Sequence, residues 1–381
     1  TAGAESLVRV PTRMAPRAKK SSFEPEPEIR PQLYPCVPVR FLWLPKWARY
    51  VLGWISITAF TATFLFPVYL PFLALPIMWS TQWLCYMHYV TLVLAVISML
   101  LPMREWKAWR CVGQLWFEIF DFSTNFSPSD CKRAITDAQK KQLILAMHPH
   151  GIVPFHAMLW CAFCEEYFTN WDTAEQEHLF GFGAAADIVC YLPFLRQWMG
   201  WVSAGSAAYK VLKNGLMHGK HDIVNRSGRI PRHLFVMPGG VAEIFVSTPG
   251  KHIIIFRGRK GLTRLSVETG AELIPVYVFG GTDFFHNLAT NDSWLSTLSR
   301  KLQMGMTVFW GRLYSPLLPY TPKVSMVMGT PIPVPSGYSG TGPVPDALVE
   351  ALHATYLEQM QTLFDAHKAA AGYADAVLEI R

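Results

Sequence analysis

The sequence predicts an α/β domain, a sheet flanked by helices, preceded by an N-terminal membrane hairpin. Between Arg49 and Arg104 there is no Asp, Glu, Lys or Arg. After that stretch, short and nearly continuous apolar runs alternate with helical patterns, which is typical of strands covered on both faces. The predicted organisation is a disordered, basic, Pro-rich tail (1–49), a two-segment membrane hairpin (50–103) and one cytosolic domain (104–381).

The hairpin prediction depends on length and on flanking charge. Tyr50–Phe66, with part of the Pro-containing run after it, and Trp83–Leu101 are each near the ~20 residues that span a bilayer. The tail carries nine Lys/Arg against four Glu, and Arg104 follows the second segment. Basic flanks place both ends in the cytosol. A re-entrant pair that does not cross stays open as an alternative, because Pro67, Pro71 and Pro76 divide the first segment.

Composition also bears on partners. A lipid bilayer is a predicted partner. Nucleic acid is not, because the large domain has 25 basic and 23 acidic residues and no basic face with interleaved aromatic side chains.

In the large domain, apolar runs indicate strands and 3.6-residue periodicity indicates helices. Gly270 directly follows one helical pattern, as a C-terminal cap would. The predicted strands are Leu143–Met147, His233–Pro238, Ile253–Phe256, Leu273–Phe279, Thr307–Trp310 and Val324–Gly329, and the predicted helices are Ile152–Phe168, Thr263–Thr269 and Asp346–Lys368.

The most informative motif is His148-Pro149-His150-Gly151, directly after the first strand. Pro149 makes a rigid corner and Gly151 permits a tight exit toward the next helix. The positive end of that helix disfavours imidazolium, so a neutral, proton-accepting histidine is expected at pH 7. That state suits a general base. A structural role for the histidines is the ordinary alternative. A metal site is not predicted, because His-x-His supplies only two ligands and no acidic residue follows closely.

Three later segments carry further candidates: Leu192–Arg196, Met237–Glu243 and the basic loop Arg257–Leu262. The glycines of Met237–Glu243 let the backbone approach a ligand. The basic side chains of Arg257–Leu262 suit phosphate binding. Each alone is typical of a turn at a strand end. Neither G-x-S-x-G nor G-x-x-x-x-G-K-[ST] occurs, which argues against hydrolases and nucleoside triphosphatases.

Taken in order, these segments resemble the type 2 acyl-CoA:diacylglycerol acyltransferase family, which includes monoacylglycerol and wax-alcohol acyltransferases. The resemblance covers roughly residues 140–370. His148–Gly151 matches the family's HPHG, Pro193–Arg196 its PxxR and Gly239–Glu243 its GGxxE. Arg259–Gly261 matches its RKGF block, with Leu262 in place of Phe.

The resemblance implies a glycerolipid-acyltransferase-like sheet, acyl-CoA as co-substrate without another cofactor, and a neutral lipid alcohol as acceptor. It also implies residence in the endoplasmic reticulum membrane or on lipid droplets. The wider glycerolipid acyltransferases share H-x-x-x-x-D and E-G-T-R, whose Arg holds an anionic acceptor. Here Pro154 and Phe155 stand where the Asp would be, and Pro238–Val241 lacks the Arg. An uncharged acceptor such as diacylglycerol is therefore predicted.

The mechanism expected from these residues is direct acyl transfer. His150, in preference to His148, takes the acceptor's hydroxyl proton, and Glu243 orients the histidine. Backbone N–H groups at Gly151 or Gly239 and Gly240 are candidate oxyanion donors. The predicted phosphate-binding residues are Arg259, Lys260 and Gly261, together with Arg196.

The sequence does not fix which alcohol accepts the acyl group. A monoacylglycerol or a long-chain alcohol fits the motifs equally well, and a non-catalytic membrane lipid-binding protein is the competing interpretation from a different class. A homo-oligomer is compatible with the sequence. Thr1 in place of Met leaves the true N-terminus unknown, and the basic, Ser-containing start leaves a plastid transit peptide as a weak alternative.

Overall fold

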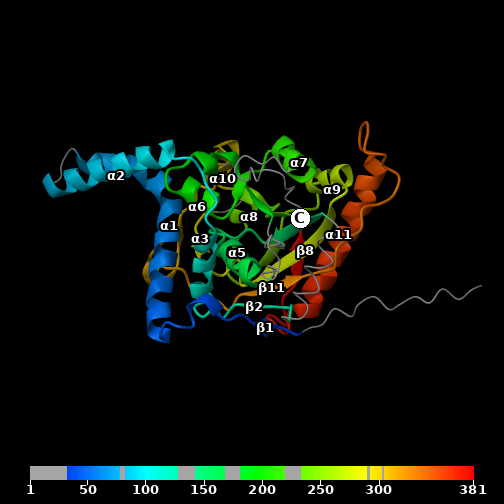
Figure 1. The fold of residues 1–381 in the computed structure, drawn as a ribbon, viewed down its shortest axis with the longest axis horizontal. Helices are drawn as coiled ribbons and strands as arrows, with labels where there is room; N and C mark the ends of the chain where they lie inside the picture. The colour runs from blue at the N-terminus through cyan, green and yellow to red at the C-terminus, as the bar shows by residue number, and fades with distance from the viewer. Residues whose placement is uncertain are drawn as a thin grey trace, which may run out of the picture.

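A computed structural model describes residues 32–77, 82–127, 142–167, 181–218, 233–289, 292–302 and 304–381. Its centre is an eight-stranded sheet in the order β1-β2-β11-β8-β3-β6-β4-β5, with helices packed against it (Figure 1). These strands are β1 (Tyr34–Pro35), β2 (Ser123–Thr124), β3 (Leu143–His148), β4 (Phe182–Ala185), β5 (Ala204–Ser206), β6 (His233–Val236), β8 (Glu272–Phe279) and β11 (Ser325–Met328).

The middle of the sheet is parallel and fully buried. β3 pairs in parallel with β6 on one side and with β8 on the other, and β11 pairs antiparallel to β8. Every residue of β3 and β8 is buried. The apolar runs therefore predicted the central strands and their burial correctly. His148, the last residue of β3, lies beside Tyr277 of β8 at the carboxyl edge of the sheet.

Two hydrophobic clusters lie on the two faces of the sheet. One includes Trp116, Phe155 and Phe284, and the other includes Leu265, Tyr356 and Phe364. Gly270 caps α9 with a φ of 73°, as predicted. The helices of the domain are α3 (Lys107–Val112), α5 (Phe155–Tyr167), α6 (Leu195–Trp201), α7 (Tyr209–His218), α8 (Gly240–Ile244), α9 (Gly261–Thr269), α10 (Trp294–Leu302) and α11 (Asp346–His367), with short 3₁₀ turns at Val39–Phe41, Gly113–Trp116, Asp187–Tyr191 and Arg312–Tyr314.

Two predicted strands lie outside the central sheet. β7 (His252–Ile254) pairs in parallel with β12 (Leu378–Ile380), and β10 (Phe309–Trp310) pairs antiparallel with β9 (His286–Asn287). The central sheet instead gains β4 and β5. Because these two strands consist mostly of glycine and alanine, they lack the large apolar side chains that make a strand recognisable in sequence.

The predicted hairpin segments are both helical. α1 (Lys46–Ile77) continues past Pro67 and Pro71, which had been expected to divide it, and α2 is Gln82–Leu100. A proline removes one helical hydrogen bond while keeping a helical φ, so it does not oblige the helix to end. Among the described helices, Lys46–Leu65 alone is long and apolar enough to cross a membrane, judged by length and composition.

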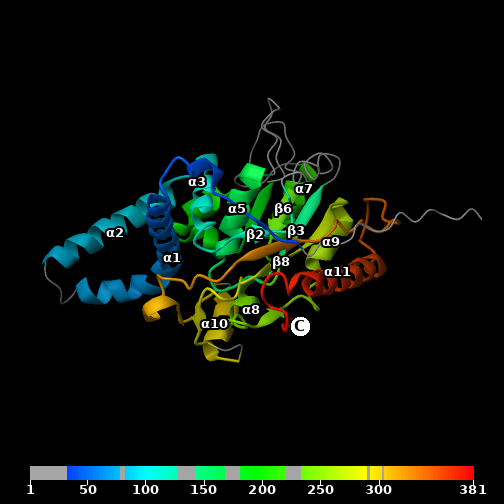
Figure 2. The same cartoon turned by 90° about the horizontal axis from the view of Figure 1, so that it is seen from below.

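One side of α1 belongs to the core of the domain. Phe60 is 1% exposed, and its ring lies 4.9–5.7 Å from the rings of Trp116, Phe155 and Trp198. Figure 2 shows the labelled part of α1 against the body of the molecule, while α2 extends away from it. The predicted boundary after the hairpin therefore does not separate α1 from the packing of the domain.

Part of the predicted disordered tail is ordered. Residues 1–31 lie outside the described part of the chain. From residue 32 the tail joins the domain, because β1 pairs with β2. The guanidinium of Arg49 donates two hydrogen bonds, of 2.9 and 2.7 Å, to the Glu118 carboxylate.

Candidate active site

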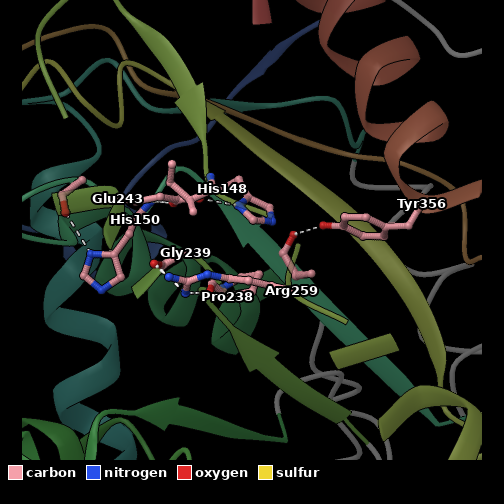
Figure 3. A network of polar contacts seen from close by, with 10 residues as sticks. His148, His150, Pro238, Gly239, Glu243, Arg259 and Tyr356 are labelled. Atoms are coloured by element: carbon pink, nitrogen blue, oxygen red, sulfur yellow. Dashed lines mark hydrogen bonds and ion pairs between the residues drawn. The ribbon is translucent and has the colours of Figure 1, made fainter. Parts of the chain in front are cut away.

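Glu243 lies at the centre of the candidate site, on α8 just after β6. Its side chain is fully buried, and its carboxylate accepts two backbone N–H groups, from His150 at 2.6 Å and from Ile255 at 2.8 Å. Oε1 also lies 3.1 Å from Nδ1 of His148. Figure 3 shows Glu243 between the two histidines. Burial raises the pKa of Glu243, but the charge and hydrogen bond of His148 and the two N–H donors outweigh it, so the net pKa is lowered.

His148 points into the protein. Its side chain is fully buried, with Phe256 packed edge-on at 5.3 Å and Tyr356 at 6.4 Å between ring centroids. Because a carboxylate only accepts, Nδ1 of His148 carries the proton toward Glu243, so Nε2 is the nitrogen that holds the lone pair when the ring is neutral. Within the described residues, Nε2 has no hydrogen-bond partner.

His150 faces a cavity. Its Nδ1 lies 2.8 Å from the carbonyl oxygen of Gly151, so Nδ1 donates and Nε2 again holds the lone pair. Burial lowers the pKa of His150, while the Gly151 carbonyl and the charge of Glu243 act in the opposite direction. The predicted neutral histidine is therefore supported, but for a different reason. Burial dominates, since α5 begins only at Phe155 and its dipole acts over about one turn.

The cavity beside His150 has a volume of about 480 Å³, within the usual ~300–1,000 Å³ of small-molecule sites. Its wall is mostly apolar and draws on α1, α5, α6, α8 and α9. The polar side chains among its described lining residues are His150, Arg259, Tyr209 and Cys161, and His150 and Arg259 approach the cavity from different segments. The apolar lining includes Phe60, Phe64, Ile152, Leu195, Met199, Val241, Ile244, Leu262 and Met304.

The glycines of the site are required by close packing. A Cβ on Gly239 would lie 1.7 Å from the carboxyl carbon of Glu243, so only glycine fits beside that side chain. Gly151 has a φ of +68°, and a Cβ there would meet the carbonyl oxygen of Gly281 at 2.5 Å. Gly240 has a φ of +48° with open space around it and lines the cavity.

The basic loop lies next to these glycines. Nη1 of Arg259 donates to the carbonyl oxygens of Pro238 and Gly239, at 3.0 and 3.1 Å (Figure 3). Lys260 forms an exposed ion pair with Glu350. Gly261 opens α9 and lines the cavity. Of the predicted substrate-binding residues, Arg259, Gly240 and Gly261 line the cavity that contains His150, and Lys260 is next to Arg259 in the chain.

Comparison with known proteins identifies the family of this chain. Residues 77–381 match the family described as diacylglycerol acyltransferase. The chain belongs to this family.

Three of the individual relatives are named after three different acceptors. Human 2-acylglycerol O-acyltransferase 3 is 31% identical over 250 residues, covering 61% of this chain and 66% of that protein. Human acyl-CoA wax alcohol acyltransferase 1 is 28% identical over 236 residues, 59% of this chain and 66% of the relative. Mouse diacylglycerol O-acyltransferase 2 is 27% identical over 299 residues, 73% of this chain and 67% of the relative. The chain thus spans about two thirds of the length of these relatives. No solved structure matches it.

Arg196, one of the predicted phosphate-binding residues, makes its contacts in another part of the protein. Arg196 donates from Nη1 to the carbonyl oxygens of Ser98, Met99 and Leu101 at the end of α2, and from Nε to Cys190. A cation there satisfies carbonyls that lack helical partners. The structure therefore places Arg196 as a helix cap, separate from the contacts of Arg259 and Lys260.

Sequence reasoning missed several residues around the histidines. Ile255 contributes only a backbone N–H, which no side-chain pattern reveals. His156 is fully buried beside His150, and burial together with that neighbour lowers its pKa to about 3. Tyr356 donates to the carbonyl oxygen of Ala146 at 3.3 Å, and its helical spacing had predicted packing alone.

The packing of Gly239 against Glu243 gives a test of the site. Gly239→Ala should displace the Glu243 carboxylate from its two N–H donors and lower the acyl-transfer rate by roughly 10²-fold. Gly258→Ala is the matched control, because a Cβ there has open space and Gly258 does not line the cavity. Rates and unfolding temperatures of both variants would be measured. Normal activity in Gly239→Ala would contradict the central place of Glu243.

Proposed function

We propose that the protein transfers an acyl group from acyl-CoA to the free hydroxyl of diacylglycerol, forming triacylglycerol. The observation that carries the proposal is the position of the His150 ring on the wall of the apolar cavity that Arg259 also lines. A general base then lies where a lipid chain and a phosphate-bearing donor can meet. Membership of the diacylglycerol acyltransferase family supports acyl transfer as the reaction class.

In the proposed mechanism, Nε2 of His150 accepts the proton of the acceptor hydroxyl as the oxygen attacks the thioester carbonyl carbon. The carbon–sulfur bond then breaks, and the imidazolium returns the proton to the CoA sulfur. The Gly151 carbonyl holds the Nδ1 proton, which keeps the lone pair on Nε2. The negative charge of Glu243 stabilises the imidazolium through space, since Glu243 touches the His150 backbone and not its ring.

The donor is proposed to bind across the basic loop. Arg259 and Lys260 are at or next to the cavity wall and can hold phosphate oxygens with charge-assisted hydrogen bonds. Gly240 and Gly261 leave the backbone accessible beside them. Arg196 is not included in this proposal, because its donors already serve α2.

The acceptor is proposed to be uncharged. Among the described lining residues, Arg259 is the one Asp, Glu, Lys or Arg side chain, and it is assigned to the donor. Monoacylglycerol is the second candidate, because the 2-acylglycerol acyltransferase relative shows 31% identity. Membranes containing the full chain, labelled acyl-CoA and a panel of diacylglycerol, monoacylglycerol and long-chain alcohol would decide. Preference for another alcohol would replace diacylglycerol, and no transfer to any would reject the catalytic proposal.

We also propose that the chain resides in the endoplasmic reticulum membrane through α1 and α2, with the site on the cytosolic side. The basic residues before α1 and after α2 support this orientation. The length and apolar composition of Lys46–Leu65 in α1 agree with it.

His150→Ala should lower kcat by roughly 10²–10⁴-fold, because the base is lost while the cavity is kept. His156→Ala is the control for removing a buried imidazole that does not line the cavity. Steady-state rates with saturating donor would be compared at equal protein. If His148→Ala abolishes turnover while His150→Ala retains it, the base is the His148 paired with Glu243.

The pH dependence of kcat/KM should report His150. The base acts when neutral, and burial lowers its pKa, so activity should be full at pH 7 and fall with an apparent pKa below about 6.5. Glu243→Gln removes a charge that raises this pKa, so the acid limb should move to still lower pH. Profiles of both proteins would be recorded. A shift toward higher pH in the variant would contradict the assignment.

The double change Arg259→Gln and Lys260→Gln should weaken the apparent affinity for acyl-CoA at least tenfold, because charged hydrogen bonds contribute about 1.5–3 kcal/mol each. The saturation curve for the acceptor should change little. Arg264→Gln is the control, since Arg264 is an exposed neighbour on α9 that pairs with Asp346. A shift confined to the acceptor would move this loop from the donor site to the lipid entrance.

A further inference from the structure

α10 has its apolar side chains on the outside. Trp294, Leu298 and Leu302 follow one another at four-residue spacing and are 76%, 37% and 49% exposed. The buried residues of this helix are Ser296 and Ser299. Their hydroxyls donate to the carbonyl oxygens of Ser293 and Met306. A helix that faces water normally has the opposite arrangement, so this face is suited to an apolar surrounding.

The same segment of chain exposes further apolar side chains. Leu288 and Val308 are exposed where the backbone N–H of Leu288 donates to the carbonyl of Val308. Leu313 and Tyr314 are 87% and 86% exposed, and both have positive φ, a conformation that is unfavourable for a residue with a side chain. We call this set the outer apolar surface: Leu288, Trp294, Leu298, Leu302, Val308, Leu313 and Tyr314.

Two observations identify what this surface contacts. It is continuous with α1, because the guanidinium of Arg312 lies 5.8 Å over the ring of Trp54 on that helix. Figure 2 shows the chain passing from α10 toward α1. In addition, the exposed cations Arg300 and Lys301 are in the last turn of α10. Apolar side chains flanked by cations are typical of helices that lie in the headgroup region of a bilayer.

The surface also adjoins the cavity. Met304 and Gly305, just beyond the end of α10, line it. A Cβ added to Gly305 would lie 2.4 Å from Cδ1 of Ile244. Ile244 is a residue of α8 that also lines the cavity. α10 and α8 lie side by side in both views (Figures 1 and 2).

We propose that the outer apolar surface lies in the interface of a lipid bilayer, as a second membrane contact besides α1 and α2, and that the acceptor enters the cavity from the bilayer beside α10. The second part rests on the proposed function. The first part rests only on the proposed membrane residence of α1 and α2, and the two are tested separately.

The membrane contact is tested by thiol labelling of the full chain in liposomes with a membrane-impermeant maleimide. Leu298→Cys should react at least tenfold more slowly than Val377→Cys, an exposed apolar position outside the surface, and both should react fully in denaturing detergent. The parent chain gives the background from its own cysteines. Equal rates in liposomes would overturn the proposal. Protection that disappears at one chain per nanodisc would assign the surface to a second copy of the chain and overturn the bilayer.

The entry route is tested by kinetics with diacylglycerol presented in the bilayer. The triple change W294S, L298S and L302S should raise the apparent KM for the acceptor roughly tenfold and leave the donor KM and the maximal rate within about twofold. Val377→Ser is the control. An unchanged acceptor KM would overturn the entry route. A parent chain without any acyl transfer would reject the proposed function and leave the labelling result valid. A triple variant that does not fold would leave Leu298→Ser alone to decide by the same comparison.

Discussion

The structure around the site depends on one buried carboxylate. A fully buried charge is costly unless it is paired and hydrogen-bonded. Glu243 meets this condition with three N–H donors from two segments: His148 and His150 at the end of β3 and in the turn after it, and Ile255 directly after β7. These contacts fix the positions of both histidines and of the strand that leads to the basic loop. Losing any one of them would leave a buried charge undersatisfied, so the two segments are held together around it.

This arrangement explains a departure that the sequence already shows. An H-x-x-x-x-D dyad places its carboxylate on the same turn and helix as the histidine, but here Phe155 stands at the Asp position. Phe155 is fully buried against Phe60 and Trp116. The negative charge is instead that of Glu243 on α8, and the absence of a side chain on Gly239 leaves room for it. Charge near the histidines is therefore kept, while the turn after β3 becomes part of the apolar core.

The sequence predicted what depends on local pattern. β3, β6, β8 and β11 were recognisable because they are buried on both faces, and α11 because Leu352, Tyr356 and Leu363 repeat at helical spacing. The short strands β4 and β5 were missed, since pairing alone defines them. In the site, the sequence identified the residue types but not their partners. Glu243 was expected against the catalytic ring, and the structure pairs it with His148 and the His150 backbone. Arg196 was expected at phosphate, yet its charge serves the end of α2, a contact nearly a hundred residues away in sequence.

β12, the last strand of the described chain, is a further contact between residues that are distant in sequence. β12 pairs with β7, and the carbonyl oxygen of Arg381 accepts the N–H groups of both Phe256 and Arg257, at 2.9 and 2.8 Å. Ile255, which donates to Glu243, and Arg259, which lines the cavity, lie on either side of that pair of bonds. Without β12, β7 would have an unpaired edge, and the backbone between the third donor of Glu243 and the basic loop would lose two hydrogen bonds. The backbone between the charge at the site and the proposed donor contact is thus held by one short strand, to which the sequence itself assigns no role.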